Sequence, residues 1–176
     1  MKATGVVRRI DDLGRIVIPK EIRRSLRIRE GDSLEIYSEG NDSIVLKKYS
    51  PVQSIENFAI QFAEAIYATS KREVIITDNE KVIACAGGFR KDIIGKKIDI
   101  RLDEKVQKRT LQIFNKNDNV EITDNLIIKS AVVLKPISVY GDLIGCVIVI
   151  GDNQITDVEK ALVESSATFL SKYLES

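Results

Sequence analysis

The sequence changes character near residue 50, and this change limits the folds open to the chain more than any other feature. Before the stretch KKYSP at 47–51 the apolar segments are short and separated by turn residues; after it a long amphipathic pattern begins. Pro51 disfavours continuation of a strand, and Ser54 can cap a following helix. We therefore expect an α+β chain of two domains, residues 1–50 and residues 51–176.

The first domain is expected to have the element order β-β-α-β-β. Gly14 can take a positive φ in a turn, Pro19 suits the first turn of a helix, and Gly40-Asn41 is a hairpin signal. A domain of this size buries only about 60% of its unfolded surface, so we expect it to dimerise. The expected strands cover residues 4–10, 15–18, 34–37 and 44–47, and the expected helix covers residues 20–26.

The second domain is expected to be an antiparallel sheet flanked by helices. Apolar residues repeat at helical spacing between Ile55 and Ile66. Thr156 and Glu159 form a capping box for a helix that runs to Tyr173. The remaining elements are expected as strands at residues 74–76, 82–86, 127–139 and 143–150 and as a helix at residues 103–114.

Each outer helix of this domain carries an apolar stripe with two alternative roles. Such stripes either cover the sheet of their own domain or pair with helices of another subunit. The sequence favours neither role over the other. In the last helix the stripe comprises Val158, Leu162, Ser165, Phe169 and Tyr173.

Basic residues are concentrated at the N-terminus. Residues 1–29 contain nine Lys and Arg and three Asp and Glu, a net charge of +6; because the whole chain carries +1, the remainder carries −5. This asymmetry is typical of a nucleic-acid-binding module attached to a partner domain. Arginine suits that role because its planar fork binds phosphate or guanine with two hydrogen bonds. A charge cluster without further motifs is more often a solvated surface.

The composition argues against catalysis. The chain has no histidine, which removes Ser-His and Cys-His nucleophilic pairs and histidine-ligated metals, so we expect no enzyme activity and no metal. Cys85 and Cys146 lie in apolar stretches and are expected as reduced core residues, with a disulfide or an exposed redox-active thiol as alternatives. No apolar run approaches the ~20 residues of a membrane span. We expect a cytoplasmic protein, associated with the nucleoid through DNA.

The run TGVVRRIDDLGRIVIPKEIRR at 4–24 closely resembles the AbrB-type DNA-binding domain, and the resemblance continues through LEIY at 34–37 and IVLKKY at 44–49. It implies a swapped-hairpin fold, in which two chains interleave their strands into one dimer, and double-stranded DNA as the partner. Four arginines match the DNA-contacting positions of that family, and two further basic residues are expected to contact phosphates. The four are Arg8, Arg15, Arg23 and Arg24, and the two are Lys2 and Arg9.

The whole chain resembles a family of sporulation regulators that join an AbrB-type domain to a GAF domain. This implies a transcription regulator, activator or repressor, that reads the sequence or shape of DNA at late sporulation genes and forms a tetramer through the helices flanking the GAF-like domain. GAF domains often hold small ligands, but no cofactor signature is evident here, and Gly87-Gly88-Phe89 either borders a pocket or only turns the chain. The alternative is an antitoxin-like module that binds DNA and a protein partner, since AbrB-type folds also serve toxin neutralisation.

Overall fold

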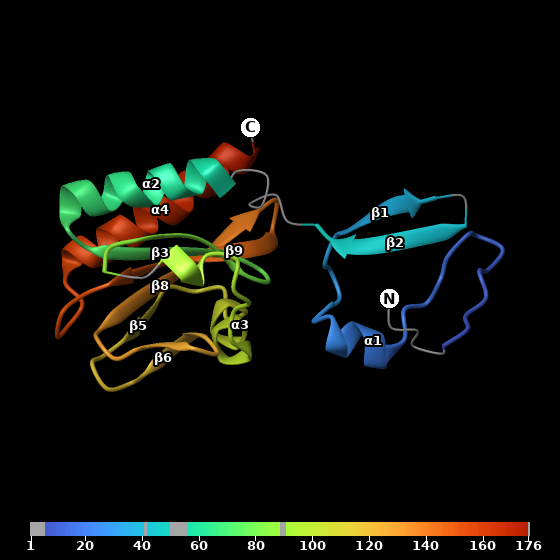
Figure 1. The fold of residues 1–176 in the computed structure, drawn as a ribbon, viewed down its shortest axis with the longest axis horizontal. Helices are drawn as coiled ribbons and strands as arrows, with labels where there is room; N and C mark the ends of the chain where they lie inside the picture. The colour runs from blue at the N-terminus through green and yellow to red at the C-terminus, as the bar shows by residue number, and fades with distance from the viewer. Residues whose placement is uncertain (1–5, 41, 50–55, 89–90, 176) are drawn as a thin grey trace. The chain divides into compact units, whose positions relative to one another are not determined.

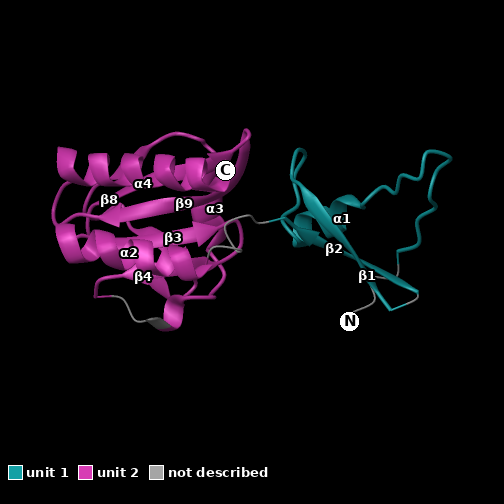
Figure 2. Ribbon diagram, turned by 90° about the horizontal axis from the view of Figure 1, so that it is seen from above, with its two compact units in different colours: residues 1–49 teal, residues 50–176 magenta. Residues whose placement is uncertain are grey.

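The computed structural model of this chain describes residues 6–40, 42–49, 56–88 and 91–175. It divides into two compact units, Met1–Tyr49 and Ser50–Ser176 (Figure 1 and Figure 2). The sequence-based boundary stands one residue later, between residues 50 and 51. Several residues used in the sequence analysis lie outside the described ranges: Asn41 of the expected hairpin turn, Pro51, the expected cap Ser54, and Ile55.

The N-terminal unit contains one helix and one hairpin, both as predicted. Helix α1 (Lys20–Ser25) follows Pro19, whose φ of −57° suits a helix entry. The chain leaves the helix at Arg27, which takes a left-handed φ of 53°. Strands β1 (Leu34–Glu39) and β2 (Ser43–Lys48) pair in antiparallel register.

Lys48 fastens the end of β2 to the segment that leaves α1. Its ammonium group lies 3.1 Å from a carboxylate oxygen of Asp32 and donates a hydrogen bond of 3.0 Å to the Arg27 carbonyl. Only 12% of the Lys48 side chain is exposed. This cation therefore holds the unit together, a role that the sequence analysis did not anticipate.

The turn predicted at residues 11–14 is formed. Gly14 has a φ of +76° and donates a backbone hydrogen bond of 3.0 Å to the Asp11 carbonyl. Asp11 in turn donates one of 3.0 Å to the Arg15 carbonyl, which closes the loop.

The strands predicted on either side of this turn do not form within one chain. Described residues 6–10 and 15–18 have no regular secondary structure, and Val7 and Val17 are 89% and 72% exposed. These segments have the apolar residues of strands, but among the described residues of the N-terminal unit most of these side chains stay exposed. An isolated two-stranded ribbon is marginally stable in water, so the two segments are not expected to pair by themselves.

The C-terminal unit is built on a five-stranded antiparallel sheet with the order β4-β3-β9-β8-β5. Tyr140 and Gly141 join β8 to β9 with φ values of 48° and 89°, the two positive angles of a type I′ turn. A side chain on Gly145 would lie 1.9 Å from the Thr77 carbonyl oxygen, so β9 approaches β3 through a glycine. The strands are β3 (Glu73–Asp78), β4 (Val82–Ala86), β5 (Gln112–Phe114), β8 (Val132–Val139) and β9 (Asp142–Ile150).

Both faces of this sheet are covered, as Figure 1 shows. On one face, helix α2 packs on β3 and β4, and helix α4 packs on β8 and β9. On the other face lie helix α3, the short 3-10 helix η2 and the β6–β7 hairpin. Burial on both sides explains why the central strands are apolar throughout. These elements are α2 (Glu56–Ser70), η2 (Lys91–Ile93), α3 (Ile100–Val106), β6 (Val120–Thr123), β7 (Leu126–Ile128) and α4 (Asp157–Glu175).

Two elements predicted in this unit are corrected by the structure. Helix α3 begins after Asp99, whose carboxylate accepts a hydrogen bond of 2.8 Å from the Arg101 N–H, and Arg109, with a φ of 60°, ends the helical run. Residues 112–114, predicted as helix, pair instead with β8. The strand predicted at 127–139 is two strands in different sheets, β7 and β8, and the partner of β7 is the unpredicted β6. Apolar spacing alone does not separate such cases.

Most of the stripe predicted along α4 does not cover the sheet, but Leu162 is partly buried and packs against the core. Val163, Ala167 and Leu170 on a neighbouring face of the helix are the residues buried in the core. Phe169 and Tyr173 of the predicted stripe are 45% and 43% exposed. The helix therefore has an inner apolar face and an outer one.

A buried ion pair ties the start of α4 to the sheet. Glu159 is fully buried and accepts hydrogen bonds from the Thr156 N–H (2.8 Å) and hydroxyl, which confirms the predicted capping box. The Nε atom of Arg72 lies 2.7 Å from Glu159 Oε1, and its Nη1 donates a bond of 2.9 Å to Asp152. Burial pushes the pKa of Glu159 up, but the bonds from Thr156 and the charge of Arg72 outweigh it and hold that pKa below its usual value.

Arg72→Met is expected to lower the free energy of unfolding by about 3 to 5 kcal/mol, because the Glu159 carboxylate stays buried without its partner. The lowered pKa means that the pair stabilises the fold above the ordinary carboxyl value of 4.5 and that this contribution is lost as the pH falls through the folded-state pKa. Denaturant unfolding at neutral and acidic pH measures both effects. Asp152→Asn, which changes the 82% exposed partner, should cost less than about 1 kcal/mol. Equal losses in the two variants would contradict this assignment.

Candidate nucleic-acid interface

Three of the predicted DNA contacts lie on the segments that flank the turn of residues 11–14. Arg8, Arg9 and Arg15 are all exposed. No carboxylate in the described part of the chain pairs with Arg8 or Arg9, so their guanidinium groups are available to an external anion. Lys2, also predicted as a contact, lies outside the described residues.

Asp11 organises this turn and orients Arg15. One of its carboxylate oxygens accepts hydrogen bonds from the backbone N–H groups of Leu13 (3.0 Å) and Arg15 (2.8 Å), and the other accepts a bond of 2.8 Å from Arg15 Nε. These bonds, first among them the backbone bond from Arg15, lower the pKa of Asp11. The Arg15 side chain remains 70% exposed, so the carboxylate positions the guanidinium without enclosing it.

Arg23 and Arg24 occupy the last turn of α1, and both are exposed. Neither has an ion-pair partner among the residues that the structure describes. The Arg23 carbonyl accepts a bond of 2.7 Å from the Ile28 N–H, which holds the chain as it leaves the helix. Cations in a last helical turn also interact favourably with the helix dipole. The position therefore suits both a structural and a binding role, and the free, adjacent guanidinium groups suit binding.

Within one chain these arginines form two groups. The loop of residues 6–18 and helix α1 occupy different parts of the N-terminal unit in Figure 1. Among the described contacts, none joins the loop arginines to those of the helix.

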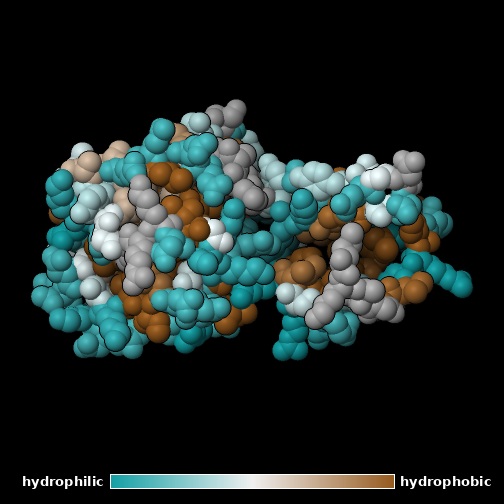
Figure 3. All heavy atoms as spheres, in the orientation of Figure 1, coloured by the Kyte–Doolittle hydropathy of each residue, from teal (hydrophilic) through white to brown (hydrophobic). Residues whose placement is uncertain are grey.

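Apolar side chains lie at the surface of the same unit. Among its described residues Pro19 is the one that is buried. Figure 3 shows hydrophobic residues, in brown, among hydrophilic ones on the side of this unit that faces the viewer. Apolar patches that are large for the size of a domain mark contact surfaces. The exposed apolar residues include Val6, Val7, Ile10, Leu13, Ile16, Val17, Ile36 and Ile44.

The two cysteines, the alternative candidates for chemistry, are buried and are not joined by a disulfide. Cys85 and Cys146 are 4% and 0% exposed. They lie on β4 and β9 with β3 between them, and strands two apart in a sheet are separated by about 9–10 Å, too far for a disulfide. The Cys146 sulfur lies 3.3 Å from the Thr77 hydroxyl, and burial raises the pKa of Cys146 to about 12. Neither a disulfide nor an exposed thiol is present.

A cavity of about 410 Å³ lies on the α3 side of the C-terminal unit. Gly88 borders it, while Gly87, with a φ of +119°, turns the chain against Glu73, so the glycine pair serves both roles considered for it; Phe89 lies outside the described residues. The other lining residues are charged or polar, except for two that are apolar. It includes Asp92, Ile93, Lys96, Lys97, Thr123, Asp124, Asn125 and Leu126.

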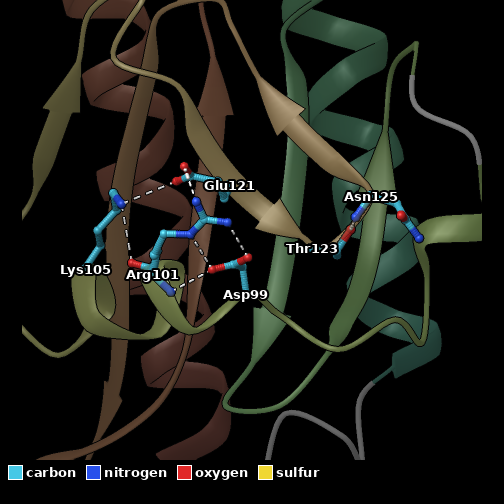
Figure 4. A network of polar contacts seen from close by, with 6 residues as sticks. All are labelled: Asp99, Arg101, Lys105, Glu121, Thr123 and Asn125. Atoms are coloured by element: carbon cyan, nitrogen blue, oxygen red, sulfur yellow. Dashed lines mark hydrogen bonds and ion pairs between the residues drawn. The ribbon is translucent and has the colours of Figure 1, made fainter.

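A network of charges lies near two of the lining residues, Thr123 and Asn125, in the same unit (Figure 4). Arg101 Nη2 lies 2.9 Å from Asp99 and its Nη1 lies 2.9 Å from Glu121, which joins the start of α3 to β6. Hydrogen bonds to Asp99 raise the pKa of Arg101 above its usual value. These charges satisfy one another, and a separate hydrogen bond of 3.4 Å joins the Asn125 N–H to the Thr123 hydroxyl at the cavity wall.

Each of the two units matches a known protein family. The family model described as stage V sporulation protein T C-terminal, transcription factor, matches residues 54–175, and the model described as antidote-toxin recognition MazE, bacterial antitoxin, matches residues 7–54. Stage V sporulation protein T of Bacillus subtilis (strain 168) is 41% identical over 177 residues, which cover 99% of both chains. The transition state regulatory protein AbrB of that organism is 59% identical over 51 residues, 29% of this chain and 52% of AbrB.

The C-terminal unit has a GAF-like fold. It is similar to the phycocyanobilin-bound GAF domain from a cyanobacterial phytochrome, with 12% identity, a TM-score of 0.52, and coverage of 70% of this chain and 87% of that one. Together with the AbrB match, this confirms the fold class predicted from the sequence. None of the helices built by the described residues has the length and apolar character needed to cross a membrane.

Both thiols are expected to react slowly with a thiol reagent in the native protein at pH 8. Burial keeps them away from the reagent, and a thiol with a pKa near 12 is protonated at that pH. Labelling followed by absorbance, with the urea-unfolded chain as the reference, measures this. Stoichiometric labelling of the native protein at the rate of the unfolded chain would contradict the buried assignment.

Proposed function

We infer that this chain, which belongs to the stage V sporulation protein T family, is a transcription regulator that binds duplex DNA through its AbrB-type N-terminal unit. The observation that carries this inference is that Arg8, Arg9, Arg23 and Arg24 are exposed and have no carboxylate partner among the described residues, on a unit 59% identical to AbrB over 51 residues. Family membership supports sporulation genes as the targets, and a DNA partner would bring the protein to the chromosome in the cytoplasm. Regulation by binding requires no catalytic group, which agrees with the absence of histidine.

The proposed DNA-binding form is a dimer in which two N-terminal units interleave their strands. Residues 6–18 supply apolar side chains that have no core to enter in their own chain, and the β1–β2 hairpin is a two-stranded sheet. Pairing with a second copy would bury these side chains and complete the strands predicted around the turn. It would also gather the arginines of both subunits into one positive surface.

Each group of arginines would take a different part of the DNA contact. The loop arginines, of which Arg15 is oriented by Asp11, are suited to enter a groove of the DNA. Arg23 and Arg24 are suited to bind the phosphates beside that groove. A six-residue helix is too short to read many base edges, so readout of DNA shape and flexibility would add to direct base contacts.

The C-terminal units are proposed to join two such dimers into a tetramer. The rings of Phe58 and Tyr173 stack with centroids 4.5 Å apart, and those of Phe62 and Phe169 lie 5.2 Å apart, so α2 and α4 together present an aromatic surface. Phe169 and Tyr173 are almost half exposed in one chain, which supports a second copy as the cover. Two linked dimers would bind DNA more tightly through effective concentration.

The cavity of the GAF-like unit is proposed to hold a small ligand that adjusts DNA affinity. A backbone hydrogen bond and an ion pair connect one wall of this cavity to the start of α2. The Lys96 carbonyl accepts a bond of 2.9 Å from the Val82 N–H, and the neighbouring Lys81 pairs with Glu56 at 3.7 Å. Because α2 follows the link to the N-terminal unit in the sequence, a shift of this wall has a route toward the DNA-binding unit.

An antitoxin-like module is the second candidate, since the MazE model matches residues 7–54. A folded unit follows that match here and belongs to the transcription-factor model, which favours the regulator. A protein partner that co-purifies with the chain at equal stoichiometry would favour the antitoxin instead.

Arg23→Ala or Arg24→Ala is expected to weaken DNA binding by about 1 to 3 kcal/mol. If four arginines from each subunit of a dimer engage phosphates, log affinity falls against log salt with a slope of up to about −7, and one loss per subunit flattens it by about 2. Binding isotherms at several salt concentrations measure both values. Lys108→Ala, an exposed cation of the C-terminal unit, is the matched control and should change neither. An unchanged slope in the arginine variants would contradict their assignment.

Phe169→Asp is expected to convert the tetramer into dimers, because a carboxylate cannot be buried in an aromatic contact. Sedimentation equilibrium measures the assembly. Thr168→Asp, the exposed neighbour on the same helix, is the control and should leave the tetramer intact. A tetramer that survives Phe169→Asp would place the contact elsewhere.

A further inference from the structure

We propose that the cavity of the GAF-like unit binds a small zwitterionic metabolite of the amino-acid class, with one carboxylate and one ammonium group. The regulatory meaning of this ligand rests on the proposed function, but its binding does not. The chemistry of the lining, rather than the fold, identifies the class.

Charged side chains of both signs line the described part of the cavity, and of these Asp124 is also attracted by the charge of Arg101. Lys96 and Lys97 supply two ammonium groups, and Asp92 and Asp124 supply two carboxylates. In the part of the chain that the structure describes, none of the four takes part in an ion pair. This differs from the adjacent network around Arg101, where each charge is met by another. The described lining of the cavity therefore carries both cations and anions that no ion pair among the described residues neutralises.

Such a lining selects against ligands with a single kind of charge. The phosphates of a nucleotide would meet Asp92 and Asp124 as well as the lysines, and a simple amine would meet the lysines as well as the carboxylates. A zwitterion places its carboxylate near the ammonium groups and its ammonium near the carboxylates. Each end then forms the charge-assisted hydrogen bonds that the protein leaves unmade.

The size and the remaining residues narrow the class further. A volume of about 410 Å³ lies toward the small end of ligand sites, which span roughly 300 to 1,000 Å³. Ile93 and Leu126, both partly buried, offer apolar surface for a side chain. The Thr123 hydroxyl is nearly buried and already accepts a bond of 3.4 Å from the Asn125 N–H, so this part of the wall is preformed. A single amino acid matches these dimensions better than a dinucleotide.

The test is calorimetric titration of the full-length protein, without DNA, with each of the twenty free amino acids as probes. The tightest binder is then compared with its amide, which lacks the carboxylate, and with its des-amino acid, which lacks the ammonium group. We expect the zwitterion to bind at least about tenfold more tightly than either analogue, since each analogue leaves one pair of charges unmatched.

Two double variants assign the charges to the two ends. Lys96→Met with Lys97→Met should weaken zwitterion binding at least about tenfold and abolish the preference over the amide. Asp92→Asn with Asp124→Asn should weaken it similarly and abolish the preference over the des-amino acid. All four side chains are exposed, so the unfolding midpoint should stay unchanged, and Lys108→Met is the matched control.

Three results would overturn the proposal: no amino acid binds, an analogue with a single charge binds as tightly as the zwitterion, or binding is insensitive to both double variants. DNA affinity is measured separately on the same preparations. If the protein binds an amino acid but does not bind DNA, the proposed function is contradicted and this inference stands. DNA binding without any amino-acid binding would contradict only this inference.

Discussion

The apolar side chains of residues 6–18 have no interior to enter within one chain. The segments that carry them have the composition of strands and the turn of a hairpin, closed by Gly14 and Asp11, yet they do not form strands alone. Burial of apolar surface is the main favourable term in folding, and here a single chain cannot obtain it. A second copy that contributes the missing surface would complete the fold and create the DNA-binding surface in one step.

The C-terminal unit, by contrast, buries most of its apolar side chains within one chain. Its sheet is covered on both faces, with separate cores against α2 and α4 and against α3 and the β6–β7 hairpin. It is self-contained except for the aromatic surface that Phe58, Phe62, Phe169 and Tyr173 leave on its two outer helices. One chain thus exposes two apolar surfaces, one on a small unit whose folding is proposed to depend on pairing and one on a unit that is already folded. This division supports the proposed assembly as a dimer of dimers.

Much of the fold was predictable from local signals. Pro19 ahead of α1, the capping box of Thr156 and Glu159, and the turn at Tyr140-Gly141 each correspond to elements that the structure contains. The failures came from apolar spacing that fits more than one structure. Residues 112–114 continue a helical pattern but join the sheet, because α3 ends at Val106 and β8 offers an edge.

The candidate DNA-binding residues were also predictable from local signals, but the cavity was not. Exposed arginines can be read from a motif, and the structure leaves Arg8, Arg9, Arg23 and Arg24 without carboxylate partners among the described residues. The cavity could not be found in this way, since Asp92, Lys96, Lys97 and Asp124 come together only when η2 and the β6–β7 turn fold onto one side of the sheet. The buried roles of Lys48 and Arg72 likewise depend on partners distant in the sequence.

Pairing of the N-terminal units is the claim on which DNA binding depends, and amide hydrogen exchange tests it most directly. In one chain, the backbone amides of residues 6–10 and 16–18 donate none of the hydrogen bonds found among the described residues, so their protection would indicate another copy. Interleaved strands predict slow exchange of these amides in the full-length protein, with protection that decreases on dilution. Exchange at the rate of an unstructured peptide at every protein concentration would contradict the paired fold.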